Sequence, residues 1–223
     1  MDDFSQRNKI TGPHQGQPVL VAGEPLERAK AAMIMLHGRG ASAEDILSLA
    51  AELNQPGFTY LAPQAAGYTW YPNSFLAPLA SNEPGLSSGL AVIATLLAQL
   101  AEVGIGPERT MLLGFSQGAC LALEFVARHA QRYGGVAGLS GGLIGPDGTP
   151  RDYPSSLAGT PLFLGCSDRD VHIPKKRVEL SAEVLQKMGG KVTARLYPNM
   201  GHTINQDEIQ CVQGIMAVLL EQL

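Results

Sequence analysis

The chain has 223 residues, of which 45% are hydrophobic and 16% are charged, so we expect one folded globular domain over residues 1–223 and not a disordered chain. Its formal net charge is −4 and no block is rich in Lys and Arg, which disfavours binding to nucleic acid or to an anionic membrane surface. No apolar run approaches the ~20 residues that cross a bilayer, and the first residues do not resemble a signal peptide, so we expect a cytoplasmic protein without membrane insertion.

Short β-rich runs alternate with longer runs of helical period, a pattern typical of parallel strands joined by helices. Strands are predicted at residues 18–21, 32–37, 58–62, 110–114, 135–139, 161–166 and 192–197. Helices are predicted at residues 43–53, 88–103, 117–130, 174–188 and 206–223. Several strands are apolar throughout, as expected when helices cover both faces of the sheet. The pattern therefore predicts an α/β fold with a mostly parallel sheet, and a long surface loop at residues 145–161.

The loop after the second strand contains two glycines, and it admits a nucleotide-binding interpretation. Gly38, Gly40 and Ala43 match the G-x-G-x-x-A fingerprint of dinucleotide-binding folds. Such a fold places an acidic residue at the end of the next strand, to bind the ribose hydroxyls. Here strand 58–62 is followed by Pro-Gln-Ala. The dinucleotide interpretation is therefore disfavoured, and no cofactor is expected.

The pattern Gly-x-Ser-x-Gly, in which small residues let a strand turn sharply into a helix and expose a serine, occurs three times. Ser87 has no strand before it, so Ser87 or Ser88 is better interpreted as a helix N-cap. Ser140 follows a strand but is not followed by a predicted helix. Only Ser116 has a strand before it and a helix after it, which makes it the candidate nucleophile. The alternative is that Ser116 merely caps the helix.

A serine nucleophile needs a histidine base, and that base needs a carboxylate on its other ring nitrogen. On this kind of scaffold the acid and then the histidine follow the serine along the chain. His202 comes after the last predicted strand and is the candidate base, whereas His172 is interpreted as a pocket or surface residue. Asp168 and Asp170 both follow the sixth strand, and their spacing alone does not separate them.

Acyl transfer also requires backbone N–H donors for the developing oxyanion. The residue after the nucleophile supplies one, which here is Gln117. The second is expected from Arg39, in the Gly-rich loop after the second strand.

These motifs resemble those of the phospholipase/carboxylesterase group of small α/β-hydrolases, which includes acyl-protein thioesterases. The resemblance covers nearly the whole chain and rests on Leu-His-Gly-Arg-Gly at 36–40, Gly-Phe-Ser-Gln-Gly at 114–118, Asp-Arg-Asp-Val-His-Ile-Pro at 168–174 and Tyr-Pro-Asn-Met-Gly-His at 197–202. It implies an α/β-hydrolase fold, cofactor-free hydrolysis of carboxylic esters or thioesters, and a possible homodimer.

The resemblance also bears on two residues. In the family the catalytic Asp stands four residues before a Pro that opens the next helix, and Asp170 has this spacing to Pro174 whereas Asp168 does not. Asp168 is then expected to form a turn with its own backbone. Thioesterase relatives usually carry an apolar residue where this chain has Arg39, which disfavours a role on long-chain protein thioesters.

The aromatic stretch at residues 68–75 is the candidate substrate pocket. Trp70 and Tyr71 are expected to line it, with the alternative that Trp70 only packs this loop onto the core. No long amphipathic insertion suggests a large lid, so an open site for small or medium esters is expected.

Three cysteines, Cys120, Cys166 and Cys211, form no CxxC pair. They predict neither a disulfide framework nor a metal site, and all three are expected to be buried.

The sequence thus predicts a carboxylesterase-type serine hydrolase that uses Ser116, His202 and Asp170. The remaining alternatives are an acyl thioesterase or lysophospholipase with the same residues, or a binding module of this fold without turnover.

Overall fold

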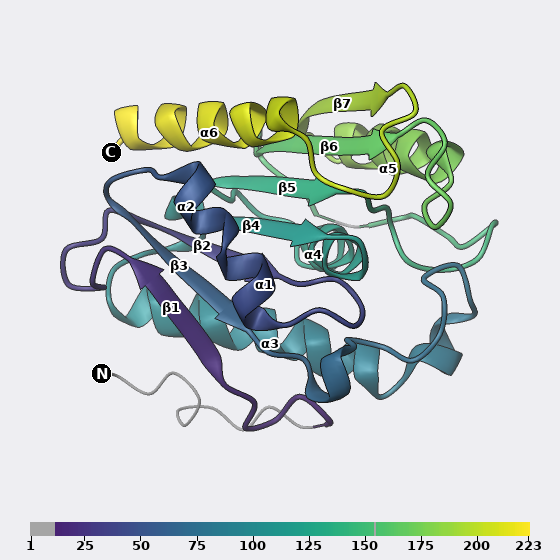
Figure 1. Cartoon of the computed structure of the whole chain (residues 1–223), viewed down its shortest axis with the longest axis horizontal. Helices are drawn as coiled ribbons and strands as arrows, with labels where there is room; N and C mark the ends of the chain where they lie inside the picture. Colours follow the sequence, from purple (N-terminus) through teal and green to yellow (C-terminus); the bar gives the residue numbers. More distant parts are fainter. Residues whose placement is uncertain (1–11, 154) are drawn as a thin grey trace.

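A seven-stranded sheet forms the centre of the computed structural model, which describes residues 12–153 and 155–223 (Figure 1). The strands lie in the order β1-β3-β2-β4-β5-β6-β7, and all of them are parallel except β1. Their bounds are β1 Val19–Gly23, β2 Ala31–Leu36, β3 Phe58–Pro63, β4 Thr110–Phe115, β5 Gly135–Leu139, β6 Pro161–Ser167 and β7 Lys191–Tyr197. Each predicted strand is present, with its ends shifted by two residues or fewer.

Successive residues of the central strands pack into two separate cores, because side chains in a strand point alternately to opposite faces. On β2, Ile34 contributes to the core beneath α3, α4 and α5, whereas Met33 and Met35 contribute to the core beneath α1, α2 and α6. Figure 1 shows the second group of helices in front of the sheet and the first group behind it. The predicted α/β architecture, with helices on both faces, is confirmed.

In the described part of the chain, six α-helices connect or follow the strands. Their bounds are α1 Ala43–Leu47, α2 Leu49–Leu53, α3 Gly85–Glu102, α4 Gln117–Arg128, α5 Lys175–Lys187 and α6 Gln206–Glu221. Short 3₁₀ helices occur at η1 Ala66–Tyr68, η2 Leu79–Asn82 and η3 Pro107–Arg109. The last three predicted helices are present, and each is two residues shorter than predicted.

The helix predicted at residues 43–53 is interrupted at Ser48, which separates α1 from α2. The Ser48 hydroxyl donates to the carbonyl oxygen of Asp45, 2.6 Å away. A serine that bonds back to the preceding turn competes with the helical ladder and bends it.

The start of the helix predicted at 88–103 was misplaced, because α3 begins at Gly85, directly after Pro84. Ser87 and Ser88 therefore lie inside the helix and do not cap it. Instead, the Glu83 carboxylate accepts hydrogen bonds from the backbone N–H and the hydroxyl of Ser87.

Helix α3 is also long and apolar enough to cross a membrane by length and composition. Since 61% of that span is buried inside the fold, this is weak evidence for a membrane segment.

The chain between β5 and β6 forms the predicted long loop. Across residues 140–153 and 155–160 it contains no helix or strand, and the described residues include no inserted lid over the carboxyl edge of the sheet. The loops that follow β2, β4, β6 and β7 meet at this open edge.

Candidate active site

Three side chains from separate loops meet at the carboxyl edge of the sheet. Ser116 follows β4, Asp170 follows β6 and His202 follows β7. The Nε2 atom of His202 is 2.8 Å from Ser116 Oγ, and its Nδ1 atom is 2.7 Å from Asp170 Oδ2. The Asp170 side chain is fully buried, and that of His202 is 18% exposed. In this geometry the imidazole can take the serine proton while the carboxylate holds the other ring nitrogen.

The turn from β4 into α4 forces the serine outward. Ser116 has φ 54° and ψ −114°, a conformation that is rare for a residue with a side chain. A Cβ atom at Gly118 would lie 2.1 Å from the carbonyl oxygen of Leu36, so only glycine fits there. The Ser116 side chain makes no capping bond to α4, which rules out the alternative that it serves as the helix cap.

Asp170 and Asp168 have different partners. The second oxygen of Asp170, Oδ1, accepts from the backbone N–H groups of His172 and Ile173 at 2.8 and 3.0 Å. Asp168 accepts from the N–H of Asn199 at 2.8 Å, so it ties the β6 loop to the β7 loop. The predicted turn within its own backbone is therefore wrong for Asp168, and Asp170 is the residue that forms such a turn.

Hydrogen bonds keep Asp170 ionised although it is buried. Burial raises the pKa of its carboxyl, but hydrogen bonds from His202 and from the amides of His172 and Ile173 outweigh it, so the pKa lies below its usual value.

The thiol of Cys166 is a further neighbour of Asp170, with Sγ 3.7 Å from the same Oδ2 atom that faces His202. Burial and the nearby carboxylate raise the pKa of Cys166 to about 12. The sulfur therefore stays protonated and donates to Asp170. No motif in the sequence indicates this contact, because Cys166 by itself predicts only a small buried side chain.

The two expected oxyanion donors, Arg39 and Gln117, both line the cavity in front of Ser116. Within the described part of the chain, neither backbone amide donates to a protein acceptor. The side chain of Gln117 points the other way: its Oε1 accepts from Trp70 N–H and its Nε2 donates to the Tyr71 carbonyl, both at 2.8 Å.

The guanidinium of Arg39 forms hydrogen bonds with three consecutive carbonyl oxygens of the same loop. It donates to Tyr71 and Pro72 at 2.9 Å and to Asn73 at 2.6 Å. Both residues expected to bind the oxyanion through their amides thus fix the loop at residues 70–73 through their side chains. The sequence did not reveal these contacts, because the partners are more than 30 residues apart.

A cavity of about 450 Å³ opens in front of Ser116. Its remaining lining comes from five segments, namely Gly38 and Ala41, Tyr71–Phe75, Phe115 with Cys120, His172–Ile173, and His202. Tyr71 therefore lies where the sequence predicted it. His172 is a pocket residue, and its ring centroid is 4.8 Å from that of His202.

Trp70 does not line this cavity, which corrects its predicted role in substrate binding. Its side chain is fully buried, and its indole N–H donates to the carbonyl oxygen of His37 at 2.9 Å. The alternative interpretation, in which Trp70 packs the loop onto the core, describes its place.

The other two motif serines also lie outside this cavity. Ser140 is buried at the end of β5, and Ser87 is exposed on α3. Cys120 and Cys166 are buried as expected, but Cys211 is partly exposed, so that prediction was wrong for one of the three. Among the described residues no cluster of His, Cys, Asp and Glu is arranged to hold a metal ion.

Comparison with known proteins places this site in a family. A family model described as phospholipase/carboxylesterase matches residues 18–220. Acyl-protein thioesterase 1 of Gibberella zeae is 32% identical over 123 residues, which are 54% of this chain and 52% of the relative. The first curated relatives are thus matched over about half of their length. Acyl-protein thioesterase 1 of Emericella nidulans is 28% identical over 219 residues, which cover 86% and 91% of the two chains.

Solved structures extend the similarity over the whole fold. A phospholipase/carboxylesterase from Dyadobacter fermentans has a TM-score of 0.86 and 41% identity, and the match covers 90% of this chain and 96% of that one. A crystal structure of esterase PE8 has a TM-score of 0.74 and 27% identity, with 91% and 98% covered.

Proposed function

The chain belongs to the phospholipase/carboxylesterase family of α/β-hydrolases, and from this premise we propose that it is a serine hydrolase that cleaves carboxylic esters of small or medium acyl groups. The observation that carries the proposal is the continuous hydrogen-bonded path from Asp170 through His202 to Ser116, at 2.7 and 2.8 Å. No group other than these side chains and backbone amides is needed for the chemistry.

In the first half-reaction, Ser116 Oγ attacks the ester carbonyl carbon while its proton moves to Nε2 of His202. The ionised Asp170 stabilises the imidazolium that forms. The amides of Arg39 and Gln117 donate to the negatively charged oxygen of the tetrahedral intermediate. When the intermediate collapses, the alcohol leaves with the proton from Nε2, and the acyl group stays on Ser116.

In the second half-reaction, water takes the place of the alcohol. His202 removes a proton from the water as it attacks the acyl carbon, and then returns that proton to Ser116 Oγ as the carboxylic acid leaves. The open cavity of about 450 Å³ admits small and medium acyl groups. Phe75, Phe115 and Ile173 give it an apolar wall suited to such groups.

Thioester hydrolysis by the same residues is the second candidate activity. It is favoured by the two curated relatives described above, which are both named acyl-protein thioesterase 1. Arg39 weighs against long protein-linked chains, because its guanidinium holds the loop that forms one wall of the cavity.

Labelling with a fluorophosphonate, followed by assays with matched esters and thioesters, tests the proposal. We expect one label per chain, none in Ser116→Ala, and normal labelling in Ser140→Ala. On p-nitrophenyl esters and acyl thioesters of graded chain length, Ser116→Ala should lose about 10³-fold or more in kcat. If the wild-type chain is not labelled, a binding module of this fold is favoured instead. If Ser140→Ala loses as much kcat as Ser116→Ala does, the choice of Ser116 as the nucleophile is wrong.

We further propose a cytoplasmic location and a homodimer, which rest on the sequence and on the family resemblance. Cell fractionation and light scattering of the purified protein test the two points separately.

A further inference from the structure

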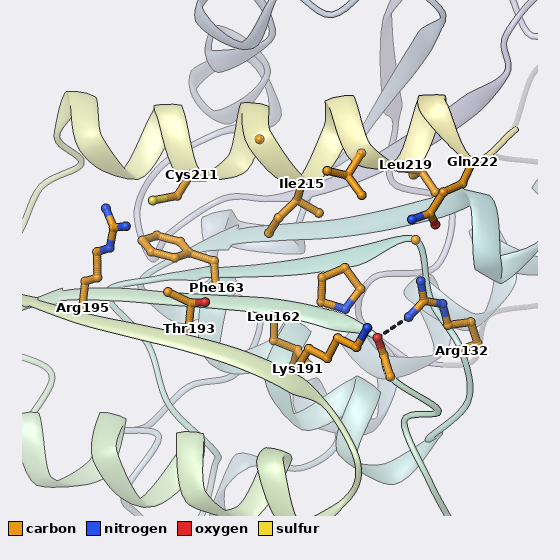
Figure 2. Close-up of a pocket in the computed structure, with 15 residues that line it drawn as sticks. Arg132, Leu162, Phe163, Lys191, Thr193, Arg195, Cys211, Ile215, Leu219 and Gln222 are labelled. Carbon is orange, nitrogen blue, oxygen red and sulfur yellow. Dashed lines mark hydrogen bonds between the residues drawn. The ribbon is translucent and has the colours of Figure 1, made fainter.

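A second cavity, of about 360 Å³, lies between α6 and the strands β6 and β7 (Figure 2) and shares no lining residue with the cavity at Ser116. It forms because β7 is the last strand of the sheet, whereas α6 packs mainly on β5 and β6. Apolar side chains line it, namely Phe163 of β6 and Ile215, Val218 and Leu219 of α6. Gly214 adds space, since a Cβ atom built there meets no atom within 4 Å.

The charged residues that line this cavity are all cations. They are Arg132, Lys191 and Arg195, and no Asp or Glu lines it, although the chain as a whole carries a net charge of −4. Arg195 is paired with Asp207 at 2.6 Å, so its charge is already offset. Among the described residues no carboxylate forms an ion pair with Arg132 or Lys191.

The two unpaired cations lie together at one end. Arg132 donates to the carbonyl oxygen of Gly159, and a Cβ atom at Gly159 would be 3.7 Å from both Arg132 and Lys191. Figure 2 shows these two side chains converging at one end of the cavity, with Ile215 and Phe163 farther along it. The cavity therefore offers a cationic end and an apolar body.

We propose that this cavity is a second ligand site, which binds a molecule with an apolar chain and one carboxylate head. The carboxylate lies between Arg132 and Lys191, where the guanidinium fork and the ammonium both donate to it. The apolar chain lies beneath Ile215 against Phe163, where it is removed from water. The volume is in the range of small-molecule sites, at the small end of ~300–1,000 Å³, and suits a medium-length chain.

Calorimetric titration with octanoate tests the site, with enzyme whose Ser116 has first been blocked by a fluorophosphonate. We expect one octanoate to bind per chain. Octan-1-ol and octylamine should bind at least about tenfold more weakly than octanoate does. The double variant Arg132→Gln/Lys191→Gln should also bind octanoate about tenfold more weakly. The control Lys176→Gln, which changes an exposed residue of α5, should bind octanoate as the wild type does.

Gly214→Leu should abolish binding, because its side chain fills the cavity. Ester hydrolysis should be unchanged in all of these variants, since none of the residues lines the cavity at Ser116. The proposal is overturned if blocked enzyme does not bind octanoate, if octan-1-ol binds equally well, or if the double variant keeps full affinity. It is also overturned if the variants change the sedimentation of the ligand-free protein, because a second copy of the chain would then cover this face. Should Gly214→Leu fail to fold, the charge variants and the head-group series still decide the question.

Discussion

The carboxylate of Asp170 is held in one orientation by hydrogen bonds to both of its oxygens. It accepts from His202, from two backbone amides and from the thiol of Cys166, so both oxygens are engaged inside the protein. These bonds fix the carboxylate so that Oδ2 faces His202. Asp168, two residues earlier, accepts instead from the N–H of Asn199.

Asp170→Asn should lower kcat by about 10⁴-fold while the fold persists, because the amide favours the wrong imidazole tautomer. Asp168→Asn keeps an oxygen for the Asn199 N–H, so it should retain kcat and lose less than ~1 kcal/mol of stability. Steady-state kinetics and thermal midpoints of both variants, measured in one buffer, check this pair. If Asp168→Asn is inactive while Asp170→Asn remains active, Asp168 and not Asp170 is the carboxylate that orients His202.

Arg39→Met should lower kcat by about 10- to 100-fold, because the loop at residues 71–73 loses three hydrogen bonds while the Arg39 amide remains. KM should change less, since the apolar wall of the cavity is retained. Arg39→Lys, with a single ammonium, should fall between Arg39→Met and the wild type. Full kcat in Arg39→Met, measured beside the exposed control Arg28→Met, would show that the guanidinium does not position this site.

Several site residues were predictable from local pattern, and others were not. Ser116 could be chosen because its flanking strand and helix are visible in the sequence. Asp170 needed the family resemblance, since both aspartates follow the same strand. Trp70 and Tyr71 are adjacent, and neighbouring side chains along an extended segment point to opposite sides, so the sequence could not say which one faces the cavity.

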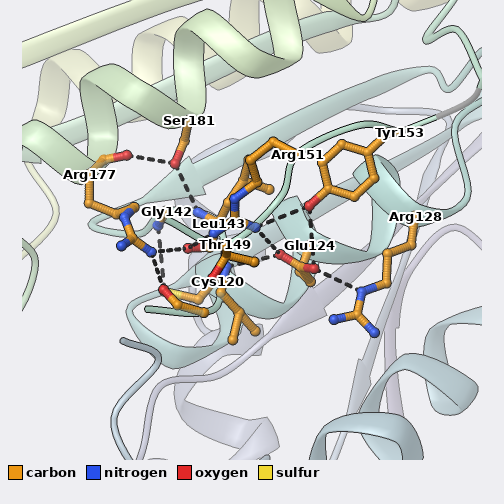
Figure 3. Close-up of polar contacts among 12 residues, drawn as sticks. Cys120, Glu124, Arg128, Gly142, Leu143, Thr149, Arg151, Tyr153, Arg177 and Ser181 are labelled. Carbon is orange, nitrogen blue, oxygen red and sulfur yellow. Dashed lines mark hydrogen bonds and ion pairs between the residues drawn. The ribbon is translucent and has the colours of Figure 1, made fainter. Parts of the chain in front are cut away.

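At the scale of elements, a buried carboxylate on α4 anchors the loop between β5 and β6 (Figure 3). Glu124 accepts from the N–H of Ile144 at 2.9 Å and from Arg128 at 2.8 Å, and it lies 3.4 Å from Arg151. On the other side of the loop, Arg177 of α5 donates to the carbonyl of Leu143. Two helices thus hold a segment without regular structure, which explains how a loop predicted only from its Gly and Pro content keeps a defined path.

Helix α6 begins with a reciprocal cap three residues after His202. Asn205 accepts from the Glu208 N–H, and the Glu208 carboxylate accepts from the Asn205 N–H, both at 2.9 Å. Glu208 is fully buried, and within the described residues its other oxygen has no partner. Burial raises the pKa of the Glu208 carboxyl to about 7.

Glu208→Gln should stabilise the protein at pH 8 by about 1 kcal/mol, because it removes a buried charge, and should change little at pH 5. At pH 5 the native carboxyl is protonated, and acid and amide both keep an oxygen for the cap. Denaturant unfolding of the variant and of the exposed control Glu179→Gln, at both pH values, measures the difference. An equal effect of Glu208→Gln at pH 5 and pH 8 would mean that its charge is not the cause.

At the scale of the whole molecule, buried histidines oppose Glu208 in setting the pH of greatest stability. His14 and His37 each accept a backbone N–H with one ring nitrogen, from Ala66 and Ala65 respectively, so both must be neutral there. Burial lowers the pKa of both below the ordinary value of 6.5.

The two kinds of group should therefore change the thermal midpoint in opposite directions on the acid side of neutral pH. Below pH 6.5 the unfolded chain binds protons at His14 and His37 that the native state does not, so stability falls as pH falls. Between 4.5 and about 7 the native state holds a proton at Glu208 that the unfolded chain releases, so this contribution to stability falls as pH rises. These two contributions have opposite signs, so removing the Glu208 carboxyl isolates the contribution of the histidines. Calorimetry of Glu208→Gln from pH 5 to 8 checks it: the thermal midpoint of this variant should fall as the pH falls below 6.5, and a midpoint that rises steadily toward pH 5 would contradict the roles of His14 and His37.

The overall architecture was predictable because strand and helix periods are local properties of the sequence. The order of the strands, and the antiparallel β1 at one edge, were not, since pairing depends on contacts between distant segments. The break at Ser48 and the start of α3 at Gly85 involve one and two side-chain hydrogen bonds respectively, which a count of apolar periods does not register.

The hydrogen bonds from Arg39 to residues 71–73 have a practical consequence for redesigning this enzyme. Its acceptors are main-chain oxygens, so the side chains at 71, 73 and the neighbouring positions can be exchanged without removing any partner of the guanidinium. A combinatorial library that randomises this wall to admit bulkier acyl groups should therefore retain a high proportion of active clones as long as Arg39 is held constant. The same library built on Arg39→Met should lose most of them.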